Sequence, residues 1–294
     1  MTIFRLGLIG YPLIHSLSPK IHITALKACG LEGNYSLFPI APDDTQALKD
    51  LLGRIRSGEL HGLNVTIPHK QNVIQFMDEL TPTAKVIGAV NTVYFRENKL
   101  IGDNTDAPGF LKDLNNFLTE SLSPILGEGL GRRAEPVEAV REKSAIVLGA
   151  GGSARAVVYA LLNDGWSVTV AARRPEQAQQ LADSFSNYQL RITNLANLPS
   201  LISNLSLLVN STPLGMTPNV DVSPLPENLS LPSNAFIYDL VYNPRETKLV
   251  KDARAKGLSA TTGLGMLIEQ AALSFELWTG HNPPRNIFYT SVVE

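Results

Sequence analysis

A glycine-rich turn between an apolar segment and a helical pattern constrains this chain more than any other feature. Residues 144–148 are typical of a buried parallel strand, and small residues at helical spacing follow the turn. The turn, Gly149-Ala150-Gly151-Gly152-Ser153-Ala154, has the G-x-G-x-x-A pattern of dinucleotide-binding folds. Gly149 permits the tight turn, Gly151 lets the backbone approach a pyrophosphate, and Ala154 keeps helix and strand close. We therefore predict a dinucleotide site rather than an ordinary glycine-rich turn.

The end of the next apolar segment indicates which dinucleotide binds. Residues 166–172 are typical of the second strand of a nucleotide-binding unit, and Arg173 and Arg174 follow Ala172. An NAD-binding protein carries Asp or Glu here for the ribose 2′-hydroxyl. A carboxylate repels a 2′-phosphate, whereas guanidinium groups bind phosphate through paired N–H donors. The arginine pair therefore predicts NADP. A P-loop is excluded because no Gly-Lys-Ser/Thr closes the glycine turn.

Composition and motifs restrict the remaining classes. The 294 residues correspond to about two domains of ~150 residues, and a net charge of −2 gives no basic surface for nucleic acid. The single cysteine, Cys29, cannot form an intrachain disulfide, which favours a reducing compartment. No run reaches the ~18 apolar residues of a membrane span, and residues 1–15 lack a signal peptide's basic start. We therefore expect a cytoplasmic protein that binds neither membrane nor nucleic acid.

Two further kinds of active site find no support in the sequence. The five histidines form no H-E-x-x-H motif and no Cys/His cluster, so we expect no metal site. No Gly-x-Ser-x-Gly sequence occurs, so a serine hydrolase is not supported.

Polar residues mark the ends of predicted elements in the first part of the chain. Ser16 and Ser18 precede a helical pattern that starts at Pro19, where two hydroxyls could bind a carboxylate, although Ser18 could equally be only the helix cap. Asn64 and Thr66 share one face of a predicted strand followed by Lys70. That arrangement fits a ligand site at a strand end and also a solvated edge strand.

Three more polar residues leave the same choice open. Asn91, inside an apolar segment, is either a hydrogen-bonded structural bridge or a ligand contact. Asp106 begins a helical pattern, where capping and substrate binding are compatible. Gln270 lies beside the apolar stripe of the last predicted helix and is either solvated or in a cleft. Residues 121–143 lack periodicity, and we predict a surface insertion there.

Together these motifs resemble the shikimate/quinate dehydrogenase family over nearly the full chain. The resemblance is carried by Ser16-Leu17-Ser18-Pro19, Asn64-Val65-Thr66-Ile67-Pro68-His69-Lys70, Ala89-Val90-Asn91-Thr92, Asn104-Thr105-Asp106, the glycine turn, Tyr238-Asp239-Leu240-Val241-Tyr242-Asn243-Pro244 and Gly263-Leu264-Gly265-Met266 with Gln270. It implies an α/β protein with a substrate-binding domain at 1–106, a Rossmann NADP-binding domain at 107–263, and a C-terminal helix at 264–294 that returns to the first domain. It leaves the assembly open, with a homodimer as the state to test.

The resemblance also implies the reversible NADPH-dependent reduction of 3-dehydroshikimate to shikimate, a step in aromatic amino-acid biosynthesis. Lys70 and Asp106 would be the catalytic pair, and Ser16 and Ser18 would bind the substrate carboxylate. The same two catalytic residues with Asn64, Thr66, Asn91, Tyr242 and Gln270 would surround the ring hydroxyls. The cofactor would contact Gly149, Ala150, Gly151, Gly152, Ser153, Ala154, Ala172, Arg173, Arg174, Thr212, Leu240, Gly263 and Met266. The alternatives are a broader quinate/shikimate dehydrogenase and a non-catalytic NADP-binding sensor.

Overall fold

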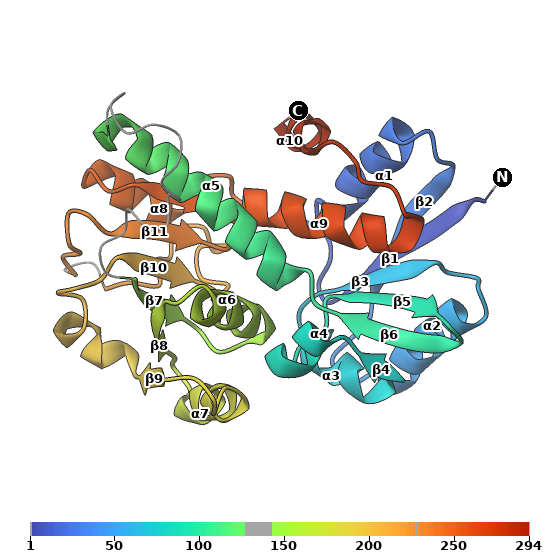
Figure 1. Cartoon of the computed structure of the whole chain (residues 1–294), viewed down its shortest axis with the longest axis horizontal. Coiled ribbons are helices and arrows are strands. Elements are labelled where there is room, and N and C mark those ends of the chain that lie inside the picture. Colours follow the sequence, from blue (N-terminus) through green and yellow to red (C-terminus); the bar gives the residue numbers. More distant parts are fainter. Residues whose placement is uncertain (1, 127–142, 227–228, 294) are drawn as a thin grey trace. The chain divides into compact units, whose positions relative to one another are not determined.

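The computed structural model describes residues 2–126, 143–226 and 229–293, which form two compact units (Figure 1). Unit 1 comprises Met1–Gly109 and Leu267–Glu294, and unit 2 comprises Phe110–Met266. Each unit contains one six-stranded sheet among the described residues. The predicted α/β class is confirmed, and so is the return of the end of the chain to the first unit.

The sheet of unit 1 is mixed. Its order is β2 (Gly33–Pro39), β1 (Phe4–Gly10), β3 (Gly62–Val65), β5 (Thr92–Arg96), β6 (Lys99–Asp103) and β4 (Glu79–Leu80). β1 pairs in parallel with β2 and β3, and β5 pairs antiparallel with β3 and β6. Asn64 therefore lies in a central strand with a neighbour on each side, so its peptide groups are part of the sheet.

The helices of unit 1 cover this sheet. They are α1 (Ser18–Ala28), α2 (Thr45–Arg56), the short α3 (His69–Asn72) and α4 (Pro82–Ile87), joined by α10 (Arg285–Val293), which packs against α1 (Figure 1). α2 begins where Asp44 accepts a hydrogen bond from the Ala47 amide. Its apolar face, led by Leu48 and Leu52, is buried against Ile9, Leu63 and other sheet residues. Each fully buried leucine contributes roughly 1.5–3 kcal/mol, so this face holds the helix in place.

The sheet of unit 2 is entirely parallel. Its order is β12 (Ala260–Thr262), β11 (Phe236–Asp239), β10 (Leu207–Asn210), β7 (Ser144–Leu148), β8 (Ser167–Ala171) and β9 (Leu190–Thr193). Counted from β7 along the chain, this is the 3-2-1-4-5-6 order of dinucleotide-binding folds. Strand order reverses between β7 and β10, which is where such sheets bind ligands. The glycine turn leaves β7 at that point.

Helices of unit 2 follow the strands as parallel connections require. They are α6 (Gly152–Asn163), α7 (Pro175–Ser184) and α8 (Lys248–Ala255), besides α5 (Asp106–Leu126) and α9 (Leu264–Thr279), which each have residues in both units. Within the described ranges, no helix is long and apolar enough to cross a membrane.

Three boundaries differ from the sequence prediction. α5 continues to Leu126, so the predicted insertion at 121–143 begins too early, and residues 127–142 lie outside the described residues. The apolar segment that contains Asn91 forms a strand only from Thr92 onward, and Gly88, with φ of 66°, ends α4 before it. The single C-terminal helix predicted at 264–294 is two helices, α9 and α10, separated after Thr279.

Candidate functional site

A buried ion pair lies at the centre of the polar residues of unit 1. Lys70, on α3 just after β3, places its Nζ 2.6 Å from Oδ2 of Asp106, the first residue of α5. The two side chains are only 11% and 6% exposed. Burying two charges is costly unless each has a close partner, so the pair holds an ammonium group in a defined position with little water around it.

The structure decides what Asp106 does at the start of α5. Asn104 Oδ1 accepts from the Ala107 amide at 3.2 Å and so performs the capping role that the sequence left open for Asp106. The second carboxylate oxygen of Asp106 accepts from Asn91 Nδ2 at 2.9 Å. The carboxylate is therefore directed at Lys70 and Asn91 by hydrogen bonds.

Asn91 connects three parts of unit 1. Its Nδ2 lies 2.9 Å from Thr105 Oγ1 and 3.2 Å from Gln270 Oε1, and its Oδ1 accepts from the Thr105 amide at 2.7 Å. Asn91 is thus a structural bridge, and it brings Gln270 of α9 next to Asp106. The substrate contact of Asn91 stays a prediction.

Asn64 is buried and has partners on both ends of its amide. Its Oδ1 accepts from the Tyr35 hydroxyl at 2.8 Å, and its Nδ2 donates to Ser274 Oγ at 3.0 Å. The solvated-edge alternative is wrong for Asn64, because β3 is a central strand. Thr66 lies one residue beyond β3 and is half-buried, and its amide donates to the Ile9 carbonyl at 2.8 Å, which continues the pairing of β3 with β1.

The structure contradicts one of the two roles left open for Ser18, that of the helix cap. α1 begins at Ser18 with Leu17 as its cap residue, and the cap residue makes no side-chain hydrogen bond. Ser16 Oγ instead accepts from the Ser18 amide at 3.2 Å. Ser18 is therefore not the side-chain cap, and the hydroxyl at the start of this helix comes from Ser16.

Sequence reasoning missed Tyr35, His22 and Ser274. Tyr35 stacks on His22 with ring centroids 4.4 Å apart and planes at 2°. Complete burial lowers the pKa of His22 to about 3, so its imidazole is neutral and serves as an aromatic support at neutral pH. A tyrosine in a strand and a serine on a helix carry no local signal, and only their contacts with Asn64 identify them.

In unit 2 the glycine turn has the backbone that the motif requires. Gly149 has φ of 106°, and a Cβ there would lie 2.7 Å from Ser211 Oγ. At Gly151, by contrast, a Cβ would meet nothing within 4 Å. Ala154 on α6 is fully buried. The backbone at Gly151 is therefore open at the start of a 12-residue helix, which fits an anionic diphosphate.

The two arginines after β8 also fit the cofactor. Ala172 is buried, whereas Arg173 and Arg174 are exposed. Neither guanidinium forms an ion pair or side-chain hydrogen bond with any residue the structure describes. Arg174 is the cap residue of α7. Two uncompensated positive charges at a helix start fit a bound phosphate group.

The other predicted cofactor residues lie at the carboxyl ends of β10, β11 and β12. Thr212 donates to Asn210 Oδ1 at 2.7 Å, and Asn210 Nδ2 donates to Asp239 Oδ1 at 2.8 Å. Burial raises the pKa of the Asp239 carboxyl to about 6. A Cβ on Gly263 would overlap the Leu240 carbonyl, so glycine is needed for this approach. Met266, the last of these cofactor residues, lies at the start of α9. Tyr242, which was predicted to contact the substrate, follows β11.

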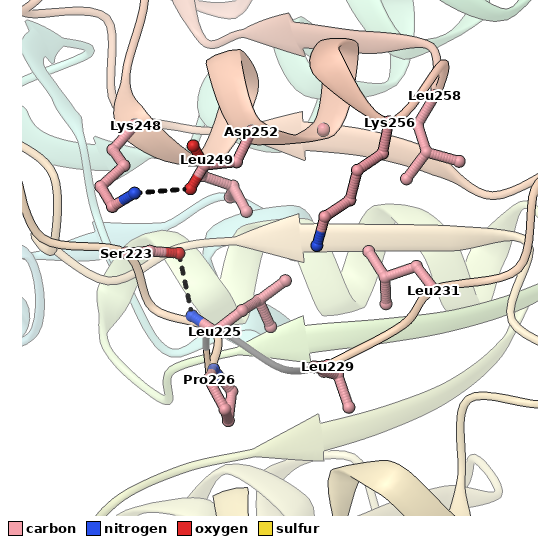
Figure 2. Close-up of a pocket in the computed structure, with 11 residues that line it drawn as sticks. Ser223, Leu225, Pro226, Leu229, Leu231, Lys248, Leu249, Asp252, Lys256 and Leu258 are labelled. Carbon is pink, nitrogen blue, oxygen red and sulfur yellow. Dashed lines mark hydrogen bonds and ion pairs between the residues drawn. The ribbon is translucent and has the colours of Figure 1, made fainter.

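A surface hollow lies against α8 in unit 2 (Figure 2). Leucines such as Leu225 and Leu249 line it, and a Lys248–Asp252 ion pair of 2.8 Å lies at its side. None of the predicted site residues lines this hollow. In the part of the chain that the structure describes, no group of three or more metal-ligating side chains occurs.

Family models match most of the chain. Residues 8–93 match the shikimate dehydrogenase substrate binding domain, residues 133–252 match shikimate / quinate 5-dehydrogenase, and residues 263–292 match the shikimate 5′-dehydrogenase C-terminal domain. The chain is similar to shikimate dehydrogenase (NADP(+)) of Carboxydothermus hydrogenoformans, with 38% identity over 97% of this chain and 95% of that one. The Bacillus subtilis protein of the same name is 37% identical over 94% of this chain and 92% of that one.

Solved structures are similar over the same length. Shikimate 5-dehydrogenase of Thermus thermophilus in complex with NADP(H) and shikimate has a TM-score of 0.81 and 37% identity, covering 99% of both chains. Quinate dehydrogenase of Corynebacterium glutamicum in complex with NAD has a TM-score of 0.81 and 31% identity, also covering 99% of both. The likeness therefore extends through both units.

Proposed function

The chain belongs to the shikimate dehydrogenase family, and from this premise we propose which of its residues do the chemistry. It catalyses the reversible NADPH-dependent reduction of 3-dehydroshikimate to shikimate, a step in aromatic amino-acid biosynthesis. The observation that carries the residue assignment is the buried Lys70–Asp106 pair, with its 2.6 Å contact.

Lys70 is the acid in reduction and the base in oxidation. NADPH, when bound, supplies the hydride that reduces the substrate ketone. As negative charge grows on the ketone oxygen, the Lys70 ammonium stabilises it and donates a proton from Nζ. In the reverse direction the neutral amine accepts the proton of the hydroxyl group. Asp106 orients Lys70, and Asn91 holds the second carboxylate oxygen.

The remaining polar residues bind the substrate. Ser16 and Ser18, at the start of α1, bind its carboxylate, which the positive end of the helix dipole favours. The ring hydroxyls are bound by Asn64, Thr66, Asn91, Asp106, Gln270 and Tyr242. The buried hydrogen bonds of Asn64 and Asn91 support this part of the proposal, because they fix amide directions before substrate arrives.

The cofactor is bound by the turn from Gly149 to Ala154, by Arg173 and Arg174, and by Thr212, Leu240, Gly263 and Met266. The open backbone at Gly151 supports binding of the pyrophosphate, and the exposed arginines support binding of the 2′-phosphate. We divide the chain accordingly into a substrate-binding domain at residues 1–106, an NADP-binding domain at 107–263, and a C-terminal segment at 264–294 that completes the substrate domain.

Two further expectations, the cellular location and the assembly of the protein, stay proposals. A cytoplasmic location is supported by the single cysteine, and cell fractionation tests it. A homodimer is tested by sedimentation of the full chain at several concentrations.

The assay that tests the function follows cofactor reduction spectrophotometrically with shikimate or quinate and with NADP⁺ or NAD⁺. We expect turnover with shikimate and NADP⁺. Comparable turnover with quinate would identify a broader enzyme, and no turnover with either substrate would identify a binding protein. The Lys70→Ala variant separates the roles, because retained turnover at saturating substrate would remove Lys70 from the mechanism.

A further inference from the structure

Four polar groups from different parts of unit 1 meet at one hydroxyl, that of Ser274 on α9. Ser274 Oγ lies 3.0 Å from Asn64 Nδ2 and 3.0 Å from the Gln270 carbonyl. It also lies 2.7 Å from Thr92 Oγ1 and 3.0 Å from Thr105 Oγ1. Ser274 has no exposed surface. One helix residue therefore contacts β3, β5 and the segment before α5.

This contact set uses the full capacity of the hydroxyl group. A serine hydroxyl donates one hydrogen bond and accepts two. Here Asn64 Nδ2 is a donor, the Gln270 carbonyl is an acceptor, and the two threonine hydroxyls compete for what remains. Because the site is fully buried, bulk water cannot replace a partner that is lost.

The neighbours of Ser274 include the residues assigned to the substrate. Asn64 contacts it through its side-chain amide, and Gln270 only through its main-chain carbonyl. Thr92 and Thr105 both donate to Asn91 Oδ1, at 3.0 and 3.2 Å. Asn91 in turn holds Asp106. We propose that Ser274 is a positioning residue that fixes the Asn64 amide directly and, through Thr92, Thr105 and Asn91, the Asp106 carboxylate. The inference rests on the proposed function, since it assumes that these side chains bind substrate.

The packing of α9 does not require this hydroxyl. Trp278, one turn later, donates from Nε1 to the Val93 carbonyl at 3.2 Å and lies against Gly62, where a Cβ would overlap its ring. Phe275 is fully buried. These contacts anchor α9 on the sheet of unit 1, so the polar contacts of Ser274 have a role in orientation beyond attachment.

The test compares Ser274→Ala with Thr279→Val by steady-state kinetics and thermal unfolding. Thr279 is a matched control, because its hydroxyl also donates to the carbonyl four residues earlier, that of Phe275 at 2.8 Å, but contacts no assigned site residue. Removing one partner of a buried polar group by Ser274→Ala should lower kcat/KM for shikimate roughly tenfold to a hundredfold. The KM for NADP⁺ should be unchanged, and Thr279→Val should change neither constant.

A second pair of variants keeps the proposal testable if Ser274→Ala folds poorly. Thr92→Val removes a hydroxyl from the same network at nearly constant shape and should lower kcat/KM for shikimate in the same way. Thr92→Ser keeps the hydroxyl, so its kcat/KM for shikimate should be close to that of the wild type. The inference would be overturned if folded Ser274→Ala and Thr92→Val kept the wild-type kcat/KM for shikimate. It would also be overturned if kcat/KM fell equally for shikimate and for NADP⁺. Wild-type protein inactive on shikimate would refute the proposed function instead.

Discussion

The ligand sites proposed for the two units are built in opposite ways. In unit 1, Lys70, Asp106, Asn91 and Asn64 are buried and bonded to one another before any ligand is present. In unit 2, the glycine turn presents open backbone at Gly151, and the arginines after β8 are exposed. One site is built from fixed side chains, and the other from main chain and solvent-exposed charge.

This difference follows from what each unit has to do. A catalytic proton donor must be held in place, since misplacement of a reacting group by about 1 Å can cost a hundredfold in rate. Cofactor binding needs only donors and charge of the right sign near a phosphate. We therefore expect substitutions in unit 1 to act on kcat and those in the turn or at the arginines to act on cofactor affinity.

The largest effect should come from Lys70→Met, which removes the proton donor. Loss of a general acid lowers kcat by about 10²–10⁴-fold, and NADPH affinity should stay unchanged. Lys99→Met is the matched control, because Lys99 forms a pair of similar length with Glu79, at 2.7 Å, but exposed to solvent. Its kcat should equal that of the wild type. Adding Asp106→Asn to Lys70→Met removes the unpaired buried charge, so it should recover stability without recovering turnover.

The second effect concerns the buried polar network of unit 2. The pKa of Asp239 is raised from 3.8 to about 6, so the folded state binds the proton more tightly than the unfolded state. Its stabilising contribution is therefore complete below pH 3.8 and is lost as pH rises to about 6. The unfolding free energy of the wild type, relative to Asp239→Asn, should fall by roughly 2–3 kcal/mol across that window. Chemical denaturation in a pH series measures this, and a constant difference contradicts it.

The third prediction separates two glycines of the same turn. Gly149→Ala should lower the unfolding free energy by about 1–2 kcal/mol, because its positive φ and the nearby Ser211 leave no room for a methyl group. Gly151→Ala should leave stability unchanged, since its Cβ meets no atom within 4 Å, but should raise the KM for NADPH. Thermal unfolding together with cofactor titration distinguishes them. Equal stabilities would show that Gly149 is not needed for the fold.

The smallest effect should be seen in Arg173→Ala. A hydrogen bond to a charged group contributes about 1.5–3 kcal/mol, so the preference for NADPH over NADH should fall at least about tenfold. The exposed Arg191 of β9 offers a control substitution, Arg191→Ala, with the preference unchanged. The ratio of kcat/KM for the two cofactors is the measurement, and a full NADPH preference in Arg173→Ala would refute the 2′-phosphate assignment.

Local pattern was sufficient for much of the fold. The hydrophobic periodicity and the helix-breaking residues predicted the glycine turn between β7 and α6, the strands β7 and β8, and the helix that follows Ser16. Errors occurred where two local preferences compete. Residues 121–126 contain Ser and Pro, which favour loops, yet α5 continues to Leu126, because propagating a formed helix costs less than nucleating one, even though Pro124 has no N–H to donate.

The polar network of unit 1 was only partly predictable. The sequence indicated candidate site residues where polar side chains lie beside apolar segments, namely Asn64, Asn91 and Asp106. It did not indicate their hydrogen-bond partners. The Asn64–Ser274 bond joins residues 210 positions apart, and no local pattern contains such a contact. Their roles in binding stay predictions until the assays above are done.

Unit 1 is assembled from both ends of the chain, and this has a consequence for its synthesis. Gln270 and Ser274 leave the ribosome after all of unit 2, whereas Asn64, Lys70 and Asp106 emerge early. Domains generally fold as units in the order in which they are translated. The nascent substrate unit therefore lacks the bonds of Ser274 to Asn64 and of Gln270 to Asn91 while the cofactor unit is already complete enough to fold.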